Sequence, residues 1–397
     1  MTEIECCIWL QTVFGPGSPI PKHIQQDYGL IQNFYEAGGR EWRLSGLFTA
    51  DQVNKMEAAD PAAACRIAAV CRRDGYRVIG ISDPAYPQRL REIHSAPAVL
   101  YVNGAWPDFD GAAAIAMVGT RDATPYGLQV ATRLASDLAR SGVWVVSGGA
   151  LGIDTAAHRA ALMAGGRTVA VLGAGFHSRY LMSNAELRRQ IAEKGVLVTE
   201  YPPDAPMRKG AFPLRNRIIS ALSLGVVVVE AGERSGALIT AQHALEQGRD
   251  VFAVPGSVLN ASSAGVNQMI QAGAKAVMSA ADVLEEYRWS YNFPADSAAV
   301  RTEPVPHPPA APTHRKSAPK PTPEPAAEPA PEPIAIDRTA LSPSAARLYD
   351  ALTTAPQPID QLTEAAGLTP RETLAAVTEL EMLGALDAKP GKLYALK

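Results

Sequence analysis

Six short apolar runs between residues 112 and 256 constrain the fold more than any other feature of the sequence. The runs are AAAIAMVG, VWVVSGG, TVAVLGAG, VLVTEY, VVVVEAG and VFAVPG. Nearly continuous Val, Ile and Ala of this length is typical of strands that are buried on both faces of a parallel sheet. Each run ends in glycine or a polar turn before a helical segment such as 128–140, 155–164 or 237–247. The alternation predicts an α/β domain with a doubly wound, Rossmann-like parallel sheet over residues 111–290.

The segments directly after these runs are the candidate binding loops. In a doubly wound sheet, ligands bind beyond the carboxyl ends of the strands. Backbone amides in such loops can face an anion, and the loops are Gly119-Thr120-Arg121, the stretch 147–154 with Gly148 and Gly149, 173–175 and 230–236. SGGALGID does not match the dinucleotide pattern G-x-G-x-x-G, and the chain has no G-x-x-x-x-G-K-[ST], so we expect neither NAD or FAD nor P-loop ATP chemistry. No cofactor is therefore expected.

The stretch MRKGAFPLRNRIIS, between the fourth and fifth runs, is the most informative local feature. It places four basic residues around Phe212 without one acid: Arg208, Lys209, Arg215 and Arg217. Guanidinium groups bind phosphate directionally and an aromatic face stacks on any base, so the pattern favours sequence-independent binding of single strands. Arg121 would join the patch at the same edge.

Other interpretations of this stretch remain open from the residues alone. The basic residues could form a solvated face while Phe212 packs in the core. Arg217 could pair with Glu230, and Asn216 could hold either backbone or a base edge. His158 is interpreted as structural, because no nucleophile or metal partner accompanies it.

The rest of the chain predicts further domains. Residues 1–75 alternate short helical stretches with turn signals and predict a small helical domain, in which Gly15-Pro16-Gly17 is an ordinary turn. Thirteen prolines between 294 and 333 predict a linker over residues 291–340. Helical stretches at 344–352, 359–366 and 371–383, with a hairpin through Pro390-Gly391, predict a winged helix over residues 341–397. Because its third helix has three glutamates and one arginine, we favour a protein-contact module or spacer over a reader of DNA.

Charge and cysteine content exclude several classes of protein. A formal net charge of -3 argues against a protein coated in positive charge, so a nucleic-acid site must be local. The four cysteines, Cys6, Cys7, Cys65 and Cys71, form no Cys-x-x-Cys pair with zinc spacing and fit a reducing compartment. Glu3 and Glu5 stand where a signal peptide needs positive charge, and no apolar run reaches membrane-spanning length. We expect a cytoplasmic protein without a metal or membrane partner.

Several motifs follow one another in the central part of the chain: MVGTR, SGGALGIDTAAH, GGRTVAVLGAG, TEYPPDAP, FPLRNRIISALS, VVVVEAGERSGALITAQHALEQGRDVFAVPG and GVNQMIQAGA. In this order, and across about 180 residues, they resemble the DprA/Smf family. Residues 76–110 resemble the connecting segment that leads into the family's central domain, residues 1–75 fit its SAM-like front domain, and the tail is similar to its winged helix. The resemblance implies a homodimer without catalytic residues that binds single-stranded DNA in natural transformation, protects it and loads RecA recombinase.

The resemblance also implies which residues form the DNA pocket. Arg121 and Lys209 would neutralise phosphates, Phe212 would stack on a base, and the glycine loops would let the strand approach the backbone. The implied set is Gly119, Thr120, Arg121, Gly148, Gly149, Lys209, Phe212, Arg215, Asn216 and Arg217. The stretch FHSRYLMSN departs from the family, which commonly has Asp and then Tyr-Pro where this chain has His177 and Leu181.

Two rival functions are weighed against this one. Related sheets cleave nucleoside monophosphates with a glutamate near P-G-G-x-G-T, but here that place has EAGERSGALIT, without the first proline and the paired glycines. A winged-helix transcription regulator with a nucleotide-sensing central domain is disfavoured by the acidic third helix.

Overall fold

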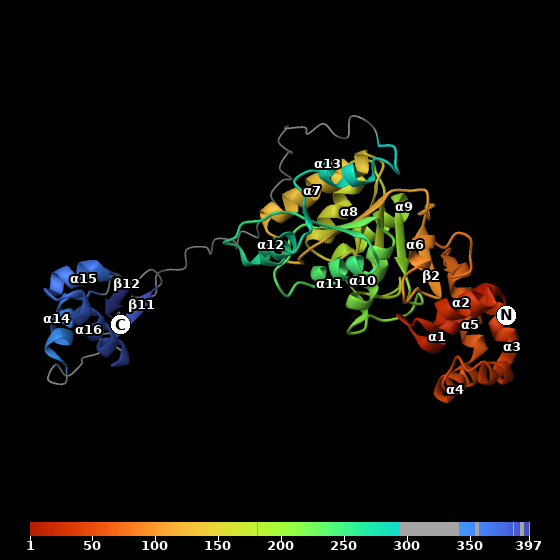
Figure 1. The fold of residues 1–397 in the computed structure, drawn as a ribbon, viewed down its shortest axis with the longest axis horizontal. Coiled ribbons are helices and arrows are strands. Elements are labelled where there is room, and N and C mark those ends of the chain that lie inside the picture. Colours follow the sequence, from red (N-terminus) through yellow and green to blue (C-terminus); the bar gives the residue numbers. More distant parts are fainter. Residues whose placement is uncertain (181, 294–340, 354–356, 384, 390–392, 397) are drawn as a thin grey trace, which may run out of the picture. The chain divides into compact units, whose positions relative to one another are not determined.

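The computed structural model describes residues 1–180, 182–293, 341–353, 357–383, 385–389 and 393–396. The chain divides into two compact units, Met1–Pro306 and His307–Lys397. Figure 1 colours the first from red to cyan and the second blue. Most of the predicted proline-rich linker, from residue 294 to residue 340, lies outside the described residues, as does Leu181.

The N-terminal region is helical, as predicted. Its helices are α1 (Glu3–Phe14), α2 (Ile20–Tyr28), α3 (Ile31–Leu44), α4 (Ala50–Ala58) and α5 (Pro61–Arg73). A capping box of Thr2 and Glu5 begins α1, whose residues 6–11 are all buried. Between α1 and α2, Gly15 and Gly17 adopt φ of 74° and 81°, a conformation that favours glycine. The Gly-Pro-Gly stretch is therefore a turn, and it lies against Leu214 of the central domain.

A nine-stranded sheet forms the centre of the first unit. Its strands are β1 (Arg77–Gly80), β2 (Val99–Gly104), β3 (Ala114–Val118), β4 (Trp144–Ser147), β5 (Thr168–Leu172), β6 (Val196–Thr199), β7 (Gly225–Val228), β8 (Asp250–Ala253) and β9 (Lys275–Ala276). The spatial order is β1-β2-β6-β5-β4-β3-β7-β8-β9. All neighbours from β6 to β9 pair in parallel. The six predicted strands are β3 to β8, so the predicted fold is confirmed.

Residues 76–110 contribute more than a connection. β1 pairs with β2, and β2 pairs with β6, both antiparallel. The short helix α6 (Gln88–Arg91) lies between β1 and β2 in the chain. This segment therefore extends the sheet, and α1 of the front helices packs on both added strands.

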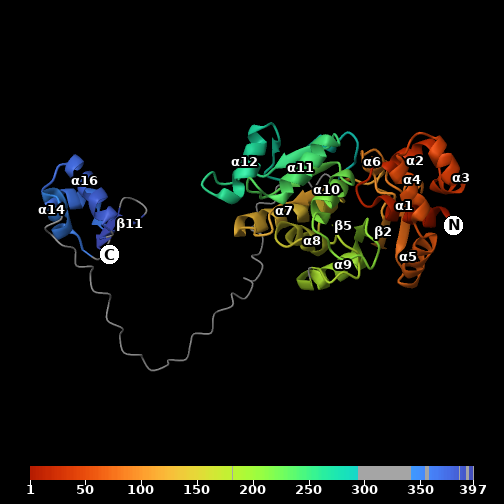
Figure 2. The same cartoon turned by 90° about the horizontal axis from the view of Figure 1, so that it is seen from below.

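Helices cover both faces of the sheet, as Figure 2 shows. Leu134, Ala157 and Val283 from α7, α8 and α13 share one core cluster. Ile218, Ala241 and Val266 from α10, α11 and α12 belong to the cluster on the opposite face. The bounds are α7 (Pro125–Arg140), α8 (Ile153–Met163), α9 (Ala185–Lys194), α10 (Ala211–Ala221), α11 (Gly236–Glu246), α12 (Ala264–Gln271) and α13 (Ala280–Leu284).

The strand order reverses at β3. From β3 the chain moves outward through β4, β5 and β6, and then returns to the other side of β3 with β7, β8 and β9. The loops that leave β3 and β7 therefore diverge, and the gap between them is where doubly wound sheets bind ligands.

In the second unit, the described residues form three helices and a three-stranded sheet of order β10-β12-β11. Its elements are α14 (Pro343–Ala351), β10 (Gln357–Pro358), α15 (Ile359–Ala366), α16 (Pro370–Met382), β11 (Leu386–Lys389) and β12 (Leu393–Leu396). Leu348, Leu362 and Leu380 are fully buried in a core of their own. The predicted helices and paired strands are confirmed, while Pro390 and Gly391 lie outside the described residues.

None of the helices in the described ranges is both long and apolar enough to cross a membrane.

Candidate functional site

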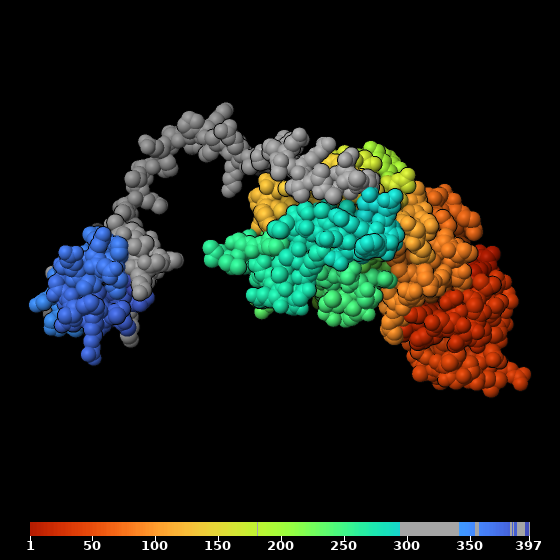
Figure 3. Space-filling model, turned by 45° about the horizontal axis from the view of Figure 1, so that its top comes forward, coloured from red at the N-terminus to blue at the C-terminus, as the bar shows by residue number. Residues whose placement is uncertain are grey.

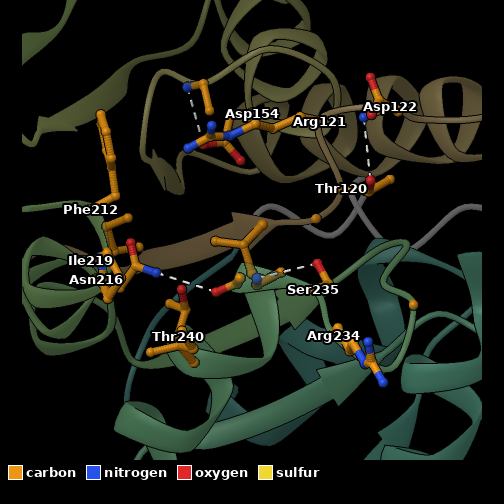
Figure 4. A pocket seen from close by; sticks show the side chains of 18 of the residues that line it. Thr120, Arg121, Asp122, Asp154, Phe212, Asn216, Ile219, Arg234, Ser235 and Thr240 are labelled. Atoms are coloured by element: carbon orange, nitrogen blue, oxygen red, sulfur yellow. Dashed lines mark hydrogen bonds between the residues drawn. The ribbon is translucent and has the colours of Figure 1, made fainter. Parts of the chain in front are cut away.

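A cleft of about 740 Å³ lies at the point where the strand order reverses. Three parts of the chain form its walls: the loop after β3, the start of α10, and the loop from β7 into α11. Figure 4 shows Phe212, Asn216 and Ile219 on one side, Thr120 and Asp122 across from them, and Arg234 and Ser235 below. Ala150 and Asp154, which follow β4, and Ala261 and Ser262, just before α12, complete the lining.

Phe212, at the start of α10, is half-buried and lines the cleft. The guanidinium carbon of exposed Arg121 lies 5.3 Å from the centre of its ring, within the range of a cation–π interaction. Tyr180 contacts the same ring, with 4.8 Å between the ring centres. The alternative that Phe212 packs in the core is therefore wrong.

Arg215 is buried, and it fixes the loop after β4. Its Nη1 donates to the carbonyl of Gly148 at 2.7 Å and also to the carbonyl of Val171. The Asp154 carboxylate accepts from the amides of Gly148 and Ala150 at 3.1 and 3.2 Å. Burial lowers the pKa of Arg215 to about 10 and raises the pKa of Asp154, while each charge opposes the shift of the other.

Arg217 lies outside the cleft. Its side chain is 3 % exposed and its Nη2 donates to both carboxylate oxygens of Glu200, at 2.7 and 2.8 Å. Glu200 also accepts from the Gln11 side chain and the Gly17 amide, so this buried ion pair joins the central domain to the front helices. The alternative that Arg217 pairs with Glu230 is wrong, because Glu200 is its partner.

Asn216 lines the cleft, and its side chain bonds to the backbone of α11. Its Nδ2 donates to the Gly236 carbonyl at 3.4 Å, and its Oδ1 accepts from Arg215 Nε at 3.3 Å. Lys209 is exposed in the turn before α10 and does not line the cleft.

The structure thus separates the sequence-predicted residues into three groups. Gly148 and Gly149 border a small cavity of about 20 Å³ that Phe212 closes from the cleft side. Lys209 and Arg217 lie outside both spaces. Those that line the cleft are Gly119, Thr120, Arg121, Phe212, Arg215 and Asn216.

Glu230 and Arg234 were not among the predicted site residues. Exposed Arg234 lines the cleft from the loop after β7, so its place directly after a strand was the signal that could have found it. Buried Glu230 accepts from the backbone and side chain of Thr124 at 2.9 and 3.1 Å, and from Ser262. It thereby connects the loops that follow β3, β7 and β8.

The two histidines discussed above have defined contacts. His158 is buried and its Nδ1 donates to Thr168 at 2.7 Å, because the Thr168 hydroxyl itself donates to a carbonyl. Burial lowers the pKa of His158 to about 3, so the side chain is neutral in the core, in keeping with the interpretation that it is structural. His177 lies between Asp204 and Asp74, at 2.7 and 3.1 Å, and so contacts the end of the front domain. Within the described ranges no three His, Cys, Asp or Glu side chains are placed to hold a metal ion.

Comparisons with known proteins match most of the chain. The family model of DNA recombination-mediator protein A matches residues 77–288, and that of the DprA winged helix domain matches residues 318–392. DNA processing protein DprA of Bacillus subtilis is 45% identical over 221 residues, which cover 56% of this chain and 74% of that protein. The putative DNA processing protein DprA of Mycobacterium tuberculosis is 37% identical over 338 residues, 82% of this chain and 78% of that protein.

Two solved structures are similar as well. The X-ray structure of DprA from Streptococcus pneumoniae aligns with a TM-score of 0.62 and 36% identity, covering 72% of this chain and 98% of that one. DNA processing protein A from Helicobacter pylori, studied for its single-stranded DNA binding mode, aligns with a TM-score of 0.50 and 29% identity. That alignment covers 54% of this chain and 97% of that one.

Proposed function

Because this chain belongs to the DprA/Smf family of DNA-processing proteins, we propose that its cleft binds single-stranded DNA independently of sequence. The observation that supports this most is the half-buried ring of Phe212, which lies in the cleft beside the Arg121 guanidinium. Bases of any identity stack on an aromatic ring, and a guanidinium binds the phosphate that follows. In a duplex the base faces are covered by stacking, so this geometry favours single strands.

Phosphates are bound by the cations around the ring. Arg121 lies on one wall of the cleft and Arg234 on the other, while Lys209 is exposed just outside. Gly119 lines the cleft and lets the strand approach the backbone there, whereas the Gly148-Gly149 loop lies behind Phe212. Arg215 acts indirectly, since its hydrogen bonds hold that loop in place. Arg217 is left out of the proposed contact surface because its charge is already paired with Glu200.

Binding proceeds without catalysis of the strand. The acids that line the cleft are Asp122 and Asp154, and Asp154 is buried and accepts two backbone amides. Such a carboxylate is occupied by the loop, which supports binding over the rival hydrolase. Release of free base from nucleoside monophosphates would contradict this part of the proposal.

The proposal extends to transfer of the strand to RecA recombinase by a homodimer in natural transformation, which the family resemblance supports. The wild-type protein is expected to speed RecA filament assembly on single strands, and to sediment as a dimer. A variant that has lost DNA binding, but remains dimeric, should not speed assembly.

Fluorescence anisotropy with a labelled single strand and its duplex tests the DNA-binding proposal. The variant Arg121→Ala/Lys209→Ala removes two cations, and Arg140→Ala/Lys194→Ala is its matched control. The control residues end α7 and α9, just before β4 and β6 begin, and so lie at the opposite edge of the sheet.

We expect wild type and control to prefer single strands, and the log of affinity to fall against log salt with a slope of about -2 to -3.5. The test variant should lose about 1.4 of that slope, which corresponds to two phosphates. Equal binding by all three proteins, or a preference for duplex, would contradict the proposal.

A further inference from the structure

Two adjacent apolar residues near the cleft are almost fully exposed. Val258 and Leu259 are 89% and 94% exposed, on the loop between β8 and α12. Scattered apolar residues are common on protein surfaces, but two neighbours at the tip of a projecting loop expose a continuous apolar surface to water. Figure 3 shows this loop as a narrow green projection from the body of the first unit.

Hydrogen bonds fix both ends of the loop, and they thereby fix the position of its tip. On the β8 side, the Pro255 carbonyl accepts from the Tyr126 hydroxyl at 2.8 Å. The Gly256 amide and carbonyl bond to the Asn267 side chain at 3.2 and 3.1 Å. On the α12 side, the Ser262 hydroxyl bonds to the Glu230 carboxylate.

The same loop is continuous with the cleft. Ala261 and Ser262 line it, only two and three residues after the exposed tip. A strand that leaves the cleft at Ala261 and Ser262 therefore meets the loop that has the tip. Residues 257–263 carry no charge, so the tip offers phosphates no cation, whereas Val258 and Leu259 offer unstacked bases an apolar surface.

We propose that Val258 and Leu259 form an apolar platform for the bases of single-stranded DNA as the strand leaves the cleft. This inference rests on the proposed function, and it extends the binding site by at least one nucleotide beyond Phe212. The platform contributes to the choice of single strands over duplex, because only an unpaired base has a free face to contact it.

The test compares the full-length wild-type chain with Val258→Ser/Leu259→Ser. Met163→Ser is the control, because Met163 is 87% exposed but ends α8, just before β5, at the opposite edge of the sheet. Binding is measured with short oligonucleotides of about 4 nucleotides and long ones of about 20, over a range of salt. Sedimentation of each protein reports its oligomeric state.

We expect the double variant to bind the long strand about 5- to 10-fold more weakly and the short strand unchanged, because the apolar area that one base buries on the tip is lost. The salt slope should stay the same, because no charge is removed. Unchanged affinity for the long strand would overturn the platform while leaving the cleft intact. A changed oligomeric state would overturn it too, since the tip would then contact a second copy. Failure of the wild type to bind either strand would instead overturn the proposed function itself.

Discussion

The three arginines near the cleft differ in whether their guanidinium groups are free to bind a phosphate. Arg121 is exposed over the ring of Phe212, Arg215 is buried and bonded to carbonyls, and Arg217 is buried against a carboxylate. The sequence predicted one basic patch for all three residues, because Arg215 and Arg217 are close in the chain and Arg121 follows a strand at the same edge of the sheet. It could not separate them, because the partners Gly148 and Glu200 are 67 and 17 residues away along the chain. Their burial depends on tertiary contacts that no local pattern encodes.

Replacement of Arg217 is expected to affect stability rather than the intrinsic DNA affinity. Arg217→Met leaves the buried Glu200 carboxylate without its cation, and should lower the free energy of unfolding by about 3–5 kcal/mol. Glu200→Gln/Arg217→Met removes both charges and should recover part of that loss. Urea denaturation followed by circular dichroism measures all three proteins. A loss below about 1 kcal/mol for the single variant would show that the pair is dispensable.

His158 gives the protein a specific response to acid. Its Nε2 has no hydrogen-bond partner among the described residues, so protonation places an unpartnered charged donor in the core. Its pKa is about 3 in the folded protein and 6.5 ordinarily, so between these values only the unfolded chain binds the proton. The neutral histidine therefore favours the fold above pH 6.5, and this contribution is lost as the pH falls from 6.5 toward 3.

The variant His158→Gln should lack this pH response. Between pH 7 and pH 5 the wild type should lose about 2 kcal/mol more of its unfolding free energy than the variant does. Urea denaturation at pH 7 and pH 5 gives this loss for each protein. Because only the losses are compared, the two proteins need not be equally stable at pH 7. Equal losses would mean that His158 is protonated in the folded state.

At the scale of elements, the six parallel strands β3 to β8 and the paired strands β11 and β12 could be predicted, whereas β1, β2 and the two-residue strand β9 could not. β3 to β8 have nearly continuous Val, Ile and Ala, because helices cover them on both faces. RVIG and VLYVNG, which form β1 and β2, do not continue this alternation of strands and long helices. β2 pairs with β6, more than ninety residues further along the chain, and β1 pairs with β2. The cleft edge was predicted from strand ends alone, but the role of Glu230 was not. The partners of Glu230 are Thr124 and Ser262, which are 106 and 32 residues away along the chain, so no local pattern indicates its role.

Glu230 is expected to hold the cleft loops together. Glu230→Ala removes the acceptor for Thr124, which caps α7, and for Ser262. We expect a loss of about 2 kcal/mol in stability, from orphaned buried donors and the uncapped helix, and weaker binding of single strands. Glu230→Gln keeps an acceptor and should lose less of both. Thermal unfolding and anisotropy measure the two effects, and an unchanged Glu230→Ala protein would refute this role.

At the scale of the whole molecule, the two compact units have separate cores. Residues 1–293 contain the whole cleft, while the second unit has the acidic helix α16, with Glu372, Glu379 and Glu381. Removal of residues 294–397 is therefore expected to change the single-strand affinity by less than about 3-fold. This is a smaller change than the loss of one base stacked on an aromatic side chain would cause. Anisotropy on the truncated and full chains decides this. Loss of binding on truncation would favour the winged-helix regulator.

Cross-linking identifies most directly where a single strand lies on the protein. A single-stranded oligonucleotide with 5-iodouracil, which cross-links to nearby aromatic side chains on irradiation, is bound to the full-length chain and the modified peptides are mapped. The proposed function predicts a cross-link within α10 at Phe212, and its disappearance in Phe212→Leu. Cross-links confined to residues 341–397, with none at the cleft, would contradict the central claim that the strand binds where the order of the sheet reverses.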